Sequence, residues 1–136
     1  ELLREFDLGL EDRLTAKVGL LSGGQRQALT LLMASLQKPK LLLLDEHTAA
    51  LDPKTAEKVL RLSDKIVEEN KLTTLMVTHN MRDAIAHGNR LIMMSNGHVV
   101  VDVSGEKKKN LTVEQLIEMF STASGSEFSN DSAILS

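Results

Sequence analysis

Two short stretches of the sequence contain residues that could do chemistry. The first is Ser22-Gly23-Gly24-Gln25, a turn whose glycines allow an anion to approach the backbone amides closely. The second is Asp45-Glu46, which directly follows the apolar residues 41–44. One carboxylate of such a pair can hold Mg²⁺, while its neighbour orients or deprotonates an attacking water molecule. Taken alone, a pair of acids after an apolar run is more simply explained as two solvated side chains.

The residues after the first stretch predict a helix. Nothing between Gly24 and Gln37 breaks a helix, and Lys38-Pro39 ends it because the residue before proline avoids the helical region. Ser22 and the glycines would lie at its N-terminus, where free amides and the helix dipole favour an anion. Apolar residues recur at the spacing of one buried face, namely Ala28, Leu29, Leu32, Met33 and Leu36.

The acid pair is predicted to end a strand. Residues 40–45 form a short apolar run that is typical of a strand buried on both faces in a parallel sheet. Asp52-Pro53 then starts a helix that runs to about Asn70, with Asp as the N-cap and Pro at the first helical position. A second, β-branched strand follows over 73–78, so the segment is predicted to be a βαβ unit. The acids would lie at the carboxyl edge of the sheet, where ligands bind in open α/β folds.

Shorter elements are expected on either side of this unit. The first 20 residues predict a short helix and a loop, with Gly9 as the helix stop. A short helix over Met81–Ala86, a hairpin around Asn96-Gly97 and a helix capped by Thr112 follow the second strand. The composition beyond Ser121 predicts a mobile tail.

Composition argues against several classes of function. A net charge of -3 and an aromatic content of 2%, without Trp or Tyr, argue against nucleic-acid binding by charge or by base stacking. The basic run Lys107-Lys108-Lys109 is expected to be a solvated turn. The absence of cysteine excludes disulfides and thiolate chemistry, and the four histidines show no zinc-ligand spacing. No run is long and apolar enough for a membrane span, so a cytoplasmic location is expected.

The order of the motifs resembles the second half of an ABC-type ATPase domain. The matching stretches are Leu21 to Gln27, Leu41 to Glu46, Ala49 to Asp52 and Thr78-His79. The resemblance implies an α/β fold: part of a P-loop NTPase (RecA-like) parallel sheet with flanking helices, then a C-terminal β-hairpin and helix. It also implies three parts, which are 1–37 with the signature loop and signature helix at the end of a helical subdomain, 38–103 as the C-terminal part of the ATPase core, and 104–136 as a C-terminal helix and flexible tail.

The resemblance also implies roles for individual residues. Ser22-Gly23-Gly24-Gln25 matches the signature loop that contacts the ATP of the opposite subunit, and Asp52 matches the D-loop at the dimer interface. Asp45 matches the acid that binds Mg²⁺ and Glu46 the catalytic acid that polarises the hydrolytic water. His79 matches the catalytic switch histidine that touches the γ-phosphate. ATP and Mg²⁺ are therefore the expected cofactors.

Two departures from the family pattern stand out. Position 47 is His where the family usually has Pro, and this side chain is expected to face solvent or the opposite subunit. The 136 residues contain no G-x-x-x-x-G-K-[ST] loop, whose amides and Lys hold the β- and γ-phosphates. The chain is therefore expected to be a piece of a longer ATPase and to be inactive alone.

Two classes of parent protein remain open. One is the ATP-hydrolysing subunit of a bacterial ABC transporter, which pairs with a second ATPase subunit and lies at the inner face of the membrane on permease subunits. Residues 73–120 resemble importer ATPases, so an extracytoplasmic binding protein and amino-acid uptake are further expectations. The other class is a soluble ABC-type ATPase of the translation or repair type, with no membrane partner. A module used only for folding or interaction is the simplest alternative.

Overall fold

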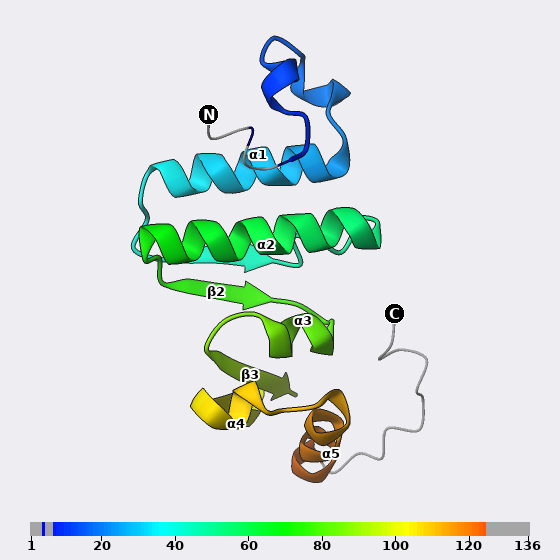
Figure 1. Ribbon diagram of the computed structural model, residues 1–136. Helices are drawn as coiled ribbons and strands as arrows, with labels where there is room; N and C mark the ends of the chain where they lie inside the picture. Colours follow the sequence, from blue (N-terminus) through cyan, green and yellow to red (C-terminus); the bar gives the residue numbers. More distant parts are fainter. Residues whose placement is uncertain (1–3, 5–6, 125–136) are drawn as a thin grey trace. The chain divides into compact units, whose positions relative to one another are not determined.

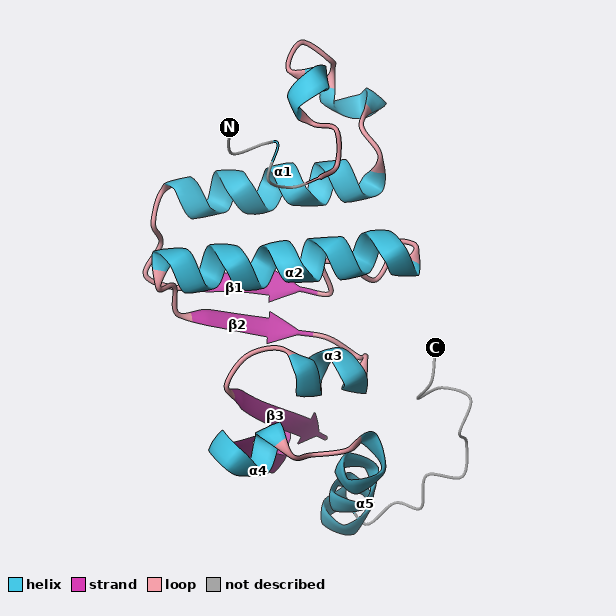
Figure 2. Ribbon diagram, in the orientation of Figure 1, coloured by secondary structure: helices cyan, strands magenta, loops and turns pink. Residues whose placement is uncertain are grey.

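The chain folds as two compact units, 1–77 and 78–136, in a computed structural model that describes residues 4 and 7–124. Each unit combines helices with a two-stranded sheet, which is antiparallel in the second unit. The sheet of the first unit is parallel, and its two strands run in the same direction in Figure 1 and Figure 2. Among the described helices, none has both the length and the apolar character that a membrane span requires.

Helix α1 spans Gly23–Leu36 and begins where the sequence predicts, with Ser22 as its N-cap. Its buried face is partly the predicted one, because Ala28 is buried and Leu29 and Leu32 pack against the core, whereas Met33 and Leu36 are more than half exposed. The fully buried positions carry mostly small residues, which let a neighbouring helix approach closely. These buried residues are Gly24, Ala28, Leu31 and Ser35.

A parallel βαβ unit follows α1. Strand β1 spans Leu42–Asp45, helix α2 spans Pro53–Asn70 and strand β2 spans Thr74–Val77. The strands pair in parallel, from Leu42 opposite Thr74 to Asp45 opposite Val77. Helices α1 and α2 pack side by side (Figure 1). The predicted α/β class, a small parallel sheet with flanking helices, is thereby confirmed.

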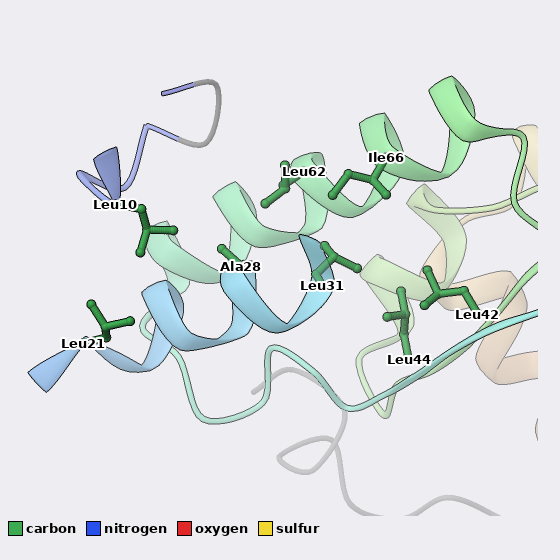
Figure 3. Close-up of a cluster of buried hydrophobic side chains, with 8 residues drawn as sticks. All are labelled: Leu10, Leu21, Ala28, Leu31, Leu42, Leu44, Leu62 and Ile66. Atoms are coloured by element: carbon green, nitrogen blue, oxygen red, sulfur yellow. The ribbon is translucent and has the colours of Figure 1, made fainter. Parts of the chain in front are cut away.

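The core of the first unit joins the two helices to one face of the sheet. Strand β1 contributes two leucines, and the other side chains come from α1, α2 and the segment before α1 (Figure 3). The buried set consists of Leu10, Leu21, Ala28, Leu31, Leu42, Leu44, Leu62 and Ile66.

The prediction that the first strand is buried on both faces is wrong for the described residues. Leu42 and Leu44 are buried, but Leu43 is 63% exposed and its partner Leu75 on β2 is 54% exposed. Successive side chains of a strand point to opposite faces, and the described helices of this unit cover one face only. The other side, called the open face here, presents Leu43, Leu75 and Val77.

The segment before α1 contains 3-10 turns after Gly9, where the sequence predicts a loop. These turns span Glu11–Arg13 and Val18–Leu20, and Gly9 before them has a φ of 65°. Leu10 anchors the segment in the core of the first unit. Residues 1–3 and 5–6, which belong to the predicted helix, lie outside the described residues.

The second unit begins with α3, Met81–Ala86, as predicted. The predicted hairpin is also present, because β3, Arg90–Ser95, pairs antiparallel with β4, His98–Ser104. Asn96 and Gly97 between them both have positive φ, which defines a turn of the primed type.

Two helices complete the second unit. Helix α4 spans Gly105–Lys109, and α5 spans Val113–Ser124 after its predicted cap, Thr112. Leu116 of α5 is buried with three residues of the hairpin, Leu91, Val101 and Val103. The tail predicted beyond Ser121 is helical as far as Ser124 and otherwise lies outside the described residues.

The basic run is not the solvated turn that the sequence predicts. Lys107, Lys108 and Lys109 end α4, and Lys108 is only 3% exposed. Its Nζ donates to the carbonyls of Ile85, at 2.5 Å, and His87, at 2.9 Å. Both carbonyls lie at the C-terminal end of α3. A cation is favourable at this end because the last carbonyls of a helix lack partners within the helix and carry partial negative charge.

Candidate functional site

The first predicted stretch forms the cap of α1. The backbone N–H of Gln25 donates to Ser22 Oγ at 3.2 Å, and the N–H of Ser22 donates to Gln25 Oε1 at 2.9 Å. This reciprocal arrangement satisfies two donors at the start of the helix. Because Ser22 Oγ is an acceptor here, its own proton can be donated to an anion.

Gln25 also ties this cap to the preceding segment. Its Nε2 donates to the carbonyl of Leu8 at 2.7 Å. The two ends of the side-chain amide are therefore both engaged within the chain, one by Ser22 and one by Leu8. The structure thus gives Gln25 a positioning role, while its contact with ATP stays a prediction.

The two glycines allow α1 to approach the start of α2. A Cβ on Gly24 would collide with Thr55 Cγ2, and a Cβ on Gly23 would lie 3.1 Å from Leu51 Cδ2. Asp52, the N-cap of α2, lies between those two neighbours in the sequence. The N-terminal ends of both helices are therefore brought together in the first unit.

Asp45 ends β1 on the open face of the sheet. It lies opposite Val77 in the register and is exposed, as is Leu43 two residues earlier. Alternate side chains of a strand share a face, so Asp45 points away from the core that contains Leu44. Its carboxylate is accordingly accessible at the carboxyl end of a parallel strand.

Glu46 has an unusual backbone conformation. Its φ is 41°, in the left-handed region that residues other than glycine rarely adopt. Its N–H donates to the carbonyl of Val77 at 2.9 Å, and its carbonyl accepts from the N–H of Ala49 at 3.0 Å. The side chain is exposed. Strained backbone of this kind persists where surrounding contacts hold it, and such positions cluster at functional sites.

Asp52 caps α2 from its exposed position. Its Oδ1 accepts from the N–H of Thr55 at 3.1 Å, and Pro53 occupies the first helical position. The hydrogen bonds from Thr55 lower the pKa of the Asp52 carboxyl below its ordinary value. The carboxyl is therefore ionised throughout the neutral pH range.

His79 is the one predicted site residue that belongs to the second unit. It is exposed in the turn before α3, and its neighbours build that turn. Thr78 Oγ1 accepts from the N–H of Asn80 at 3.1 Å, and Asn80 Oδ1 accepts from the N–H of Arg82 at 2.9 Å. The first unit holds the others: Ser22, Gly23, Gly24, Gln25, Asp45, Glu46 and Asp52.

His47 is directed toward α2 of its own unit and is not fully exposed to solvent, while the contact with the opposite subunit that the sequence also allows stays a prediction. It is half-buried, and its Nε2 lies 3.0 Å from Ser63 Oγ on α2. Ser63 is buried in turn. No sequence signal connects the two positions, because the contact depends on how the loop after β1 folds back onto the middle of α2.

The donors at the end of β1 suit a cation that is only partly held by protein. In the part of the chain that the structure describes, no three His, Asp or Glu side chains gather as in a preformed metal site. Asp45 and Glu46 instead offer exposed carboxylates next to each other. Mg²⁺ commonly binds through one or two carboxylates and takes waters and substrate phosphates as its other ligands.

Comparison with known proteins agrees with this arrangement. The family described as ABC transporter matches residues 1–49, which include the capped start of α1 and the acid pair. The parallel βαβ unit, its acid pair and this match agree with the resemblance to an ABC-type ATPase domain that the sequence shows.

Individual relatives point the same way. The "Tyrosine transport ATP-binding protein" of Clostridioides difficile is 57% identical over 122 residues, which cover 90% of this chain and 49% of that protein. The "Aliphatic sulfonates import ATP-binding protein SsuB" of Albidiferax ferrireducens is 40% identical over 103 residues, or 75% of this chain and 37% of that protein. A protein of the same description from Burkholderia cenocepacia is 38% identical over 96 residues, or 71% of this chain and 30% of that protein.

Each of these matches covers only part of the relative. The chain spans about half the length of the tyrosine transport protein and less of the two sulfonate import proteins. All three are described as ATP-binding proteins of transport or import, which favours the transporter class over the soluble class.

Proposed function

We propose that the chain is part of the ATP-hydrolysing subunit of a bacterial ABC importer. The observation that carries this proposal is the position of Asp45 and Glu46 at the carboxyl edge of a parallel βαβ unit, in the same unit as the capped start of α1. Ligands bind at this edge in open α/β folds.

Asp45 is the proposed ligand of Mg²⁺. Its carboxylate is exposed on the open face, and the register fixes its backbone opposite Val77. When bound, the cation neutralises charge on the β- and γ-phosphates of ATP. Asp45 would hold the cation through its carboxylate at the end of β1, and Mg²⁺ commonly takes phosphate and water as its other ligands.

Glu46 is the proposed acid that orients and polarises the attacking water. Its backbone is held on one side by Val77 and on the other by Ala49, so its side chain starts from a fixed position. Fixed placement of this kind is a large part of what an enzyme contributes to phosphoryl transfer. His79, exposed before α3, is the proposed contact to the γ-phosphate.

The signature loop and the D-loop are proposed to face a second ATPase subunit. Ser22 has a proton to donate, and the two glycines that follow it bring the N-terminal ends of α1 and α2 close together. Such a combination favours a phosphate, which in this proposal belongs to ATP held mainly by the other subunit. Gln25 would act by fixing the loop, and Asp52 would take part in the contact between subunits.

The remaining partners follow from the transporter class. We propose membrane permease subunits and an extracytoplasmic binding protein as partners, with the ATPase on the cytoplasmic side of the membrane. The proposed cargo is an amino acid, and the tyrosine transport relative makes an aromatic amino acid the first one to test. Import into membrane vesicles that contain the assembled transporter would measure this directly.

The 136 residues by themselves are proposed not to turn over ATP. They supply Asp45, Glu46, His79 and the signature loop, but no G-x-x-x-x-G-K-[ST] loop. Without its amides and Lys, little in the sequence would hold the β- and γ-phosphates. Adding a separately expressed segment that carries such a loop should restore binding, which isothermal titration with ATP can measure.

Glu46→Gln in the full-length protein tests the proposed chemistry. We expect MgATP binding to persist and dimers to accumulate with ATP in size-exclusion chromatography, because the phosphate contacts remain. Turnover should fall by roughly 10²-fold or more, the usual contribution of a general base. Glu69→Gln, at an exposed position near the end of α2, is the matched control and should hydrolyse ATP normally. An unchanged rate in the Glu46 variant would refute the assignment.

A further inference from the structure

We infer that His47 is a positioning residue for Glu46, and that it acts through a hydrogen bond to Ser63. The inference rests on the catalytic role proposed for Glu46. Its starting point is the 3.0 Å separation of His47 Nε2 and Ser63 Oγ, which joins the residue after the acid to the middle of α2.

The neighbours of Ser63 fix the direction of this hydrogen bond. Ser63 Oγ lies 2.8 Å from the carbonyl of Val59, which can only accept. The single hydroxyl proton is therefore donated to Val59, in the back-bonded geometry common for serine in helices. Ser63 Oγ must then accept from His47, so the imidazole carries a proton on Nε2.

The hydrogen bond between His47 and Ser63 adds to the contacts that fix the backbone of Glu46. Glu46, with its φ of 41°, is bonded through its N–H to Val77 and through its carbonyl to Ala49. The side chain of His47 adds a third anchor, to a buried residue on α2. The loop that follows β1 is thereby tied to β2, to itself and to α2, all within the first unit.

Because position 47 is a histidine, the loop after β1 must be restrained by a side-chain hydrogen bond. A proline at this position would restrain the loop through its fixed φ, and would also disfavour helical conformations at the preceding residue. His47 imposes no such backbone restraint. Its hydrogen bond to Ser63 supplies the restraint in another way, and leaves Glu46 free to adopt the left-handed conformation.

Kinetics of the full-length protein test this inference. His47→Ala and Ser63→Ala should each lower kcat for ATP hydrolysis by roughly 10-fold or more, because small displacements of a catalytic group are costly. KM for MgATP should stay within about twofold, since no phosphate contact is removed. The double variant should be no slower than the slower single variant, because both changes break the same bond. His98→Ala, on the exposed hairpin, is the control and should match the parent.

Two amide variants separate the hydrogen bond from mere bulk. Gln at position 47 can place an N–H donor where His places Nε2–H, whereas Asn places its amide near the position of Nδ1. His47→Gln should therefore recover most of the parent kcat, and His47→Asn should behave like His47→Ala. Equal activities of the Gln and Asn variants, or additive losses in the double variant, would overturn the inference.

The protonated nitrogen gives a readout that does not depend on turnover. A long-range ¹H–¹⁵N correlation spectrum of the same protein at neutral pH should show His47 protonated on Nε2, and Ser63→Ala should weaken that preference. A proton predominantly on Nδ1 would overturn the inference even if the variants lost activity through misfolding. If the parent protein hydrolysed no ATP, the proposed function would fail, while this spectrum would still judge the anchor.

Discussion

Gly24 on α1 lies so close to Thr55 on α2 that any side chain at position 24 would meet Thr55 Cγ2. The glycine that the sequence marks as part of a phosphate-binding loop is thus also a packing residue. Within the chain, it sets the distance between the starts of the two helices.

Gly24→Ala should therefore destabilise the fold. Overpacking typically costs about 1–3 kcal/mol, which outweighs the gain of up to about 1 kcal/mol from better helix propensity. Thermal unfolding followed by circular dichroism should show a lower midpoint. Thr55→Ser removes the methyl group concerned, so the double variant should recover the loss. Gly19→Ala, where the added Cβ would meet nothing within 4 Å, is the control. An unaffected midpoint in Gly24→Ala would contradict the close approach.

Gln25 combines two functions that substitutions can separate. Gln25→Glu keeps an oxygen for the N–H of Ser22 but loses the donor to Leu8, at a cost of about 1 kcal/mol. Gln25→Ala loses both bonds and should cost more. Hydrogen exchange should quicken around residues 8–10 in both variants, but at the start of α1 mainly in Gln25→Ala. The same exchange pattern in both variants would show that the two functions are not separable.

The Asp52 cap predicts a response to acid. Its pKa is lowered in the folded state by the hydrogen bonds from Thr55, so the unfolded chain binds this proton more tightly. The cap therefore contributes stability above the unfolded pKa, and loses it as pH falls through the lower folded pKa, below roughly pH 4. Asp52→Asn keeps a capping oxygen without a charge, so its stability should fall less over that range. Parallel pH profiles for the parent and the variant would argue against this role.

Lys108 offers a prediction in the second unit. Lys108→Met should destabilise this unit by about 1.5–3 kcal/mol, because the carbonyls of Ile85 and His87 lose a charged donor. Lys107→Met, at the exposed neighbouring position, should change stability little. Chemical unfolding of the two variants in parallel makes the comparison. Equal effects would mean that the buried ammonium does not support α3.

The sequence predicts most of the fold because its signals are local. Lys38-Pro39, Asp52-Pro53, Asn96-Gly97 and Thr112 each act on neighbouring residues, and the elements they delimit begin or end close to the predicted positions. The face of α1 is harder to predict because Met33 and Leu36 have the right spacing, whereas the actual choice depends on how closely α2 approaches. That distance is a property of the packed unit.

In the candidate site too, features set by neighbouring residues can be predicted and features set by tertiary contacts cannot. The acid pair and the signature loop can be located from residue types and order, since both follow short local rules. The contacts of His47 and Lys108 cannot, because each joins residues that are distant in the chain and pairs common residue types. Whether the predicted site residues act in hydrolysis stays a prediction that the variants above address.

The backbone of Glu46 implies a trade-off between stability and activity at this position. A left-handed conformation costs a residue other than glycine roughly 1–2 kcal/mol. Glycine would relax that strain, yet it would remove the carboxylate on which the proposed hydrolysis depends. Selection for stability alone would therefore favour an inactive protein at this position, and a search for stabilising substitutions should leave residue 46 unchanged.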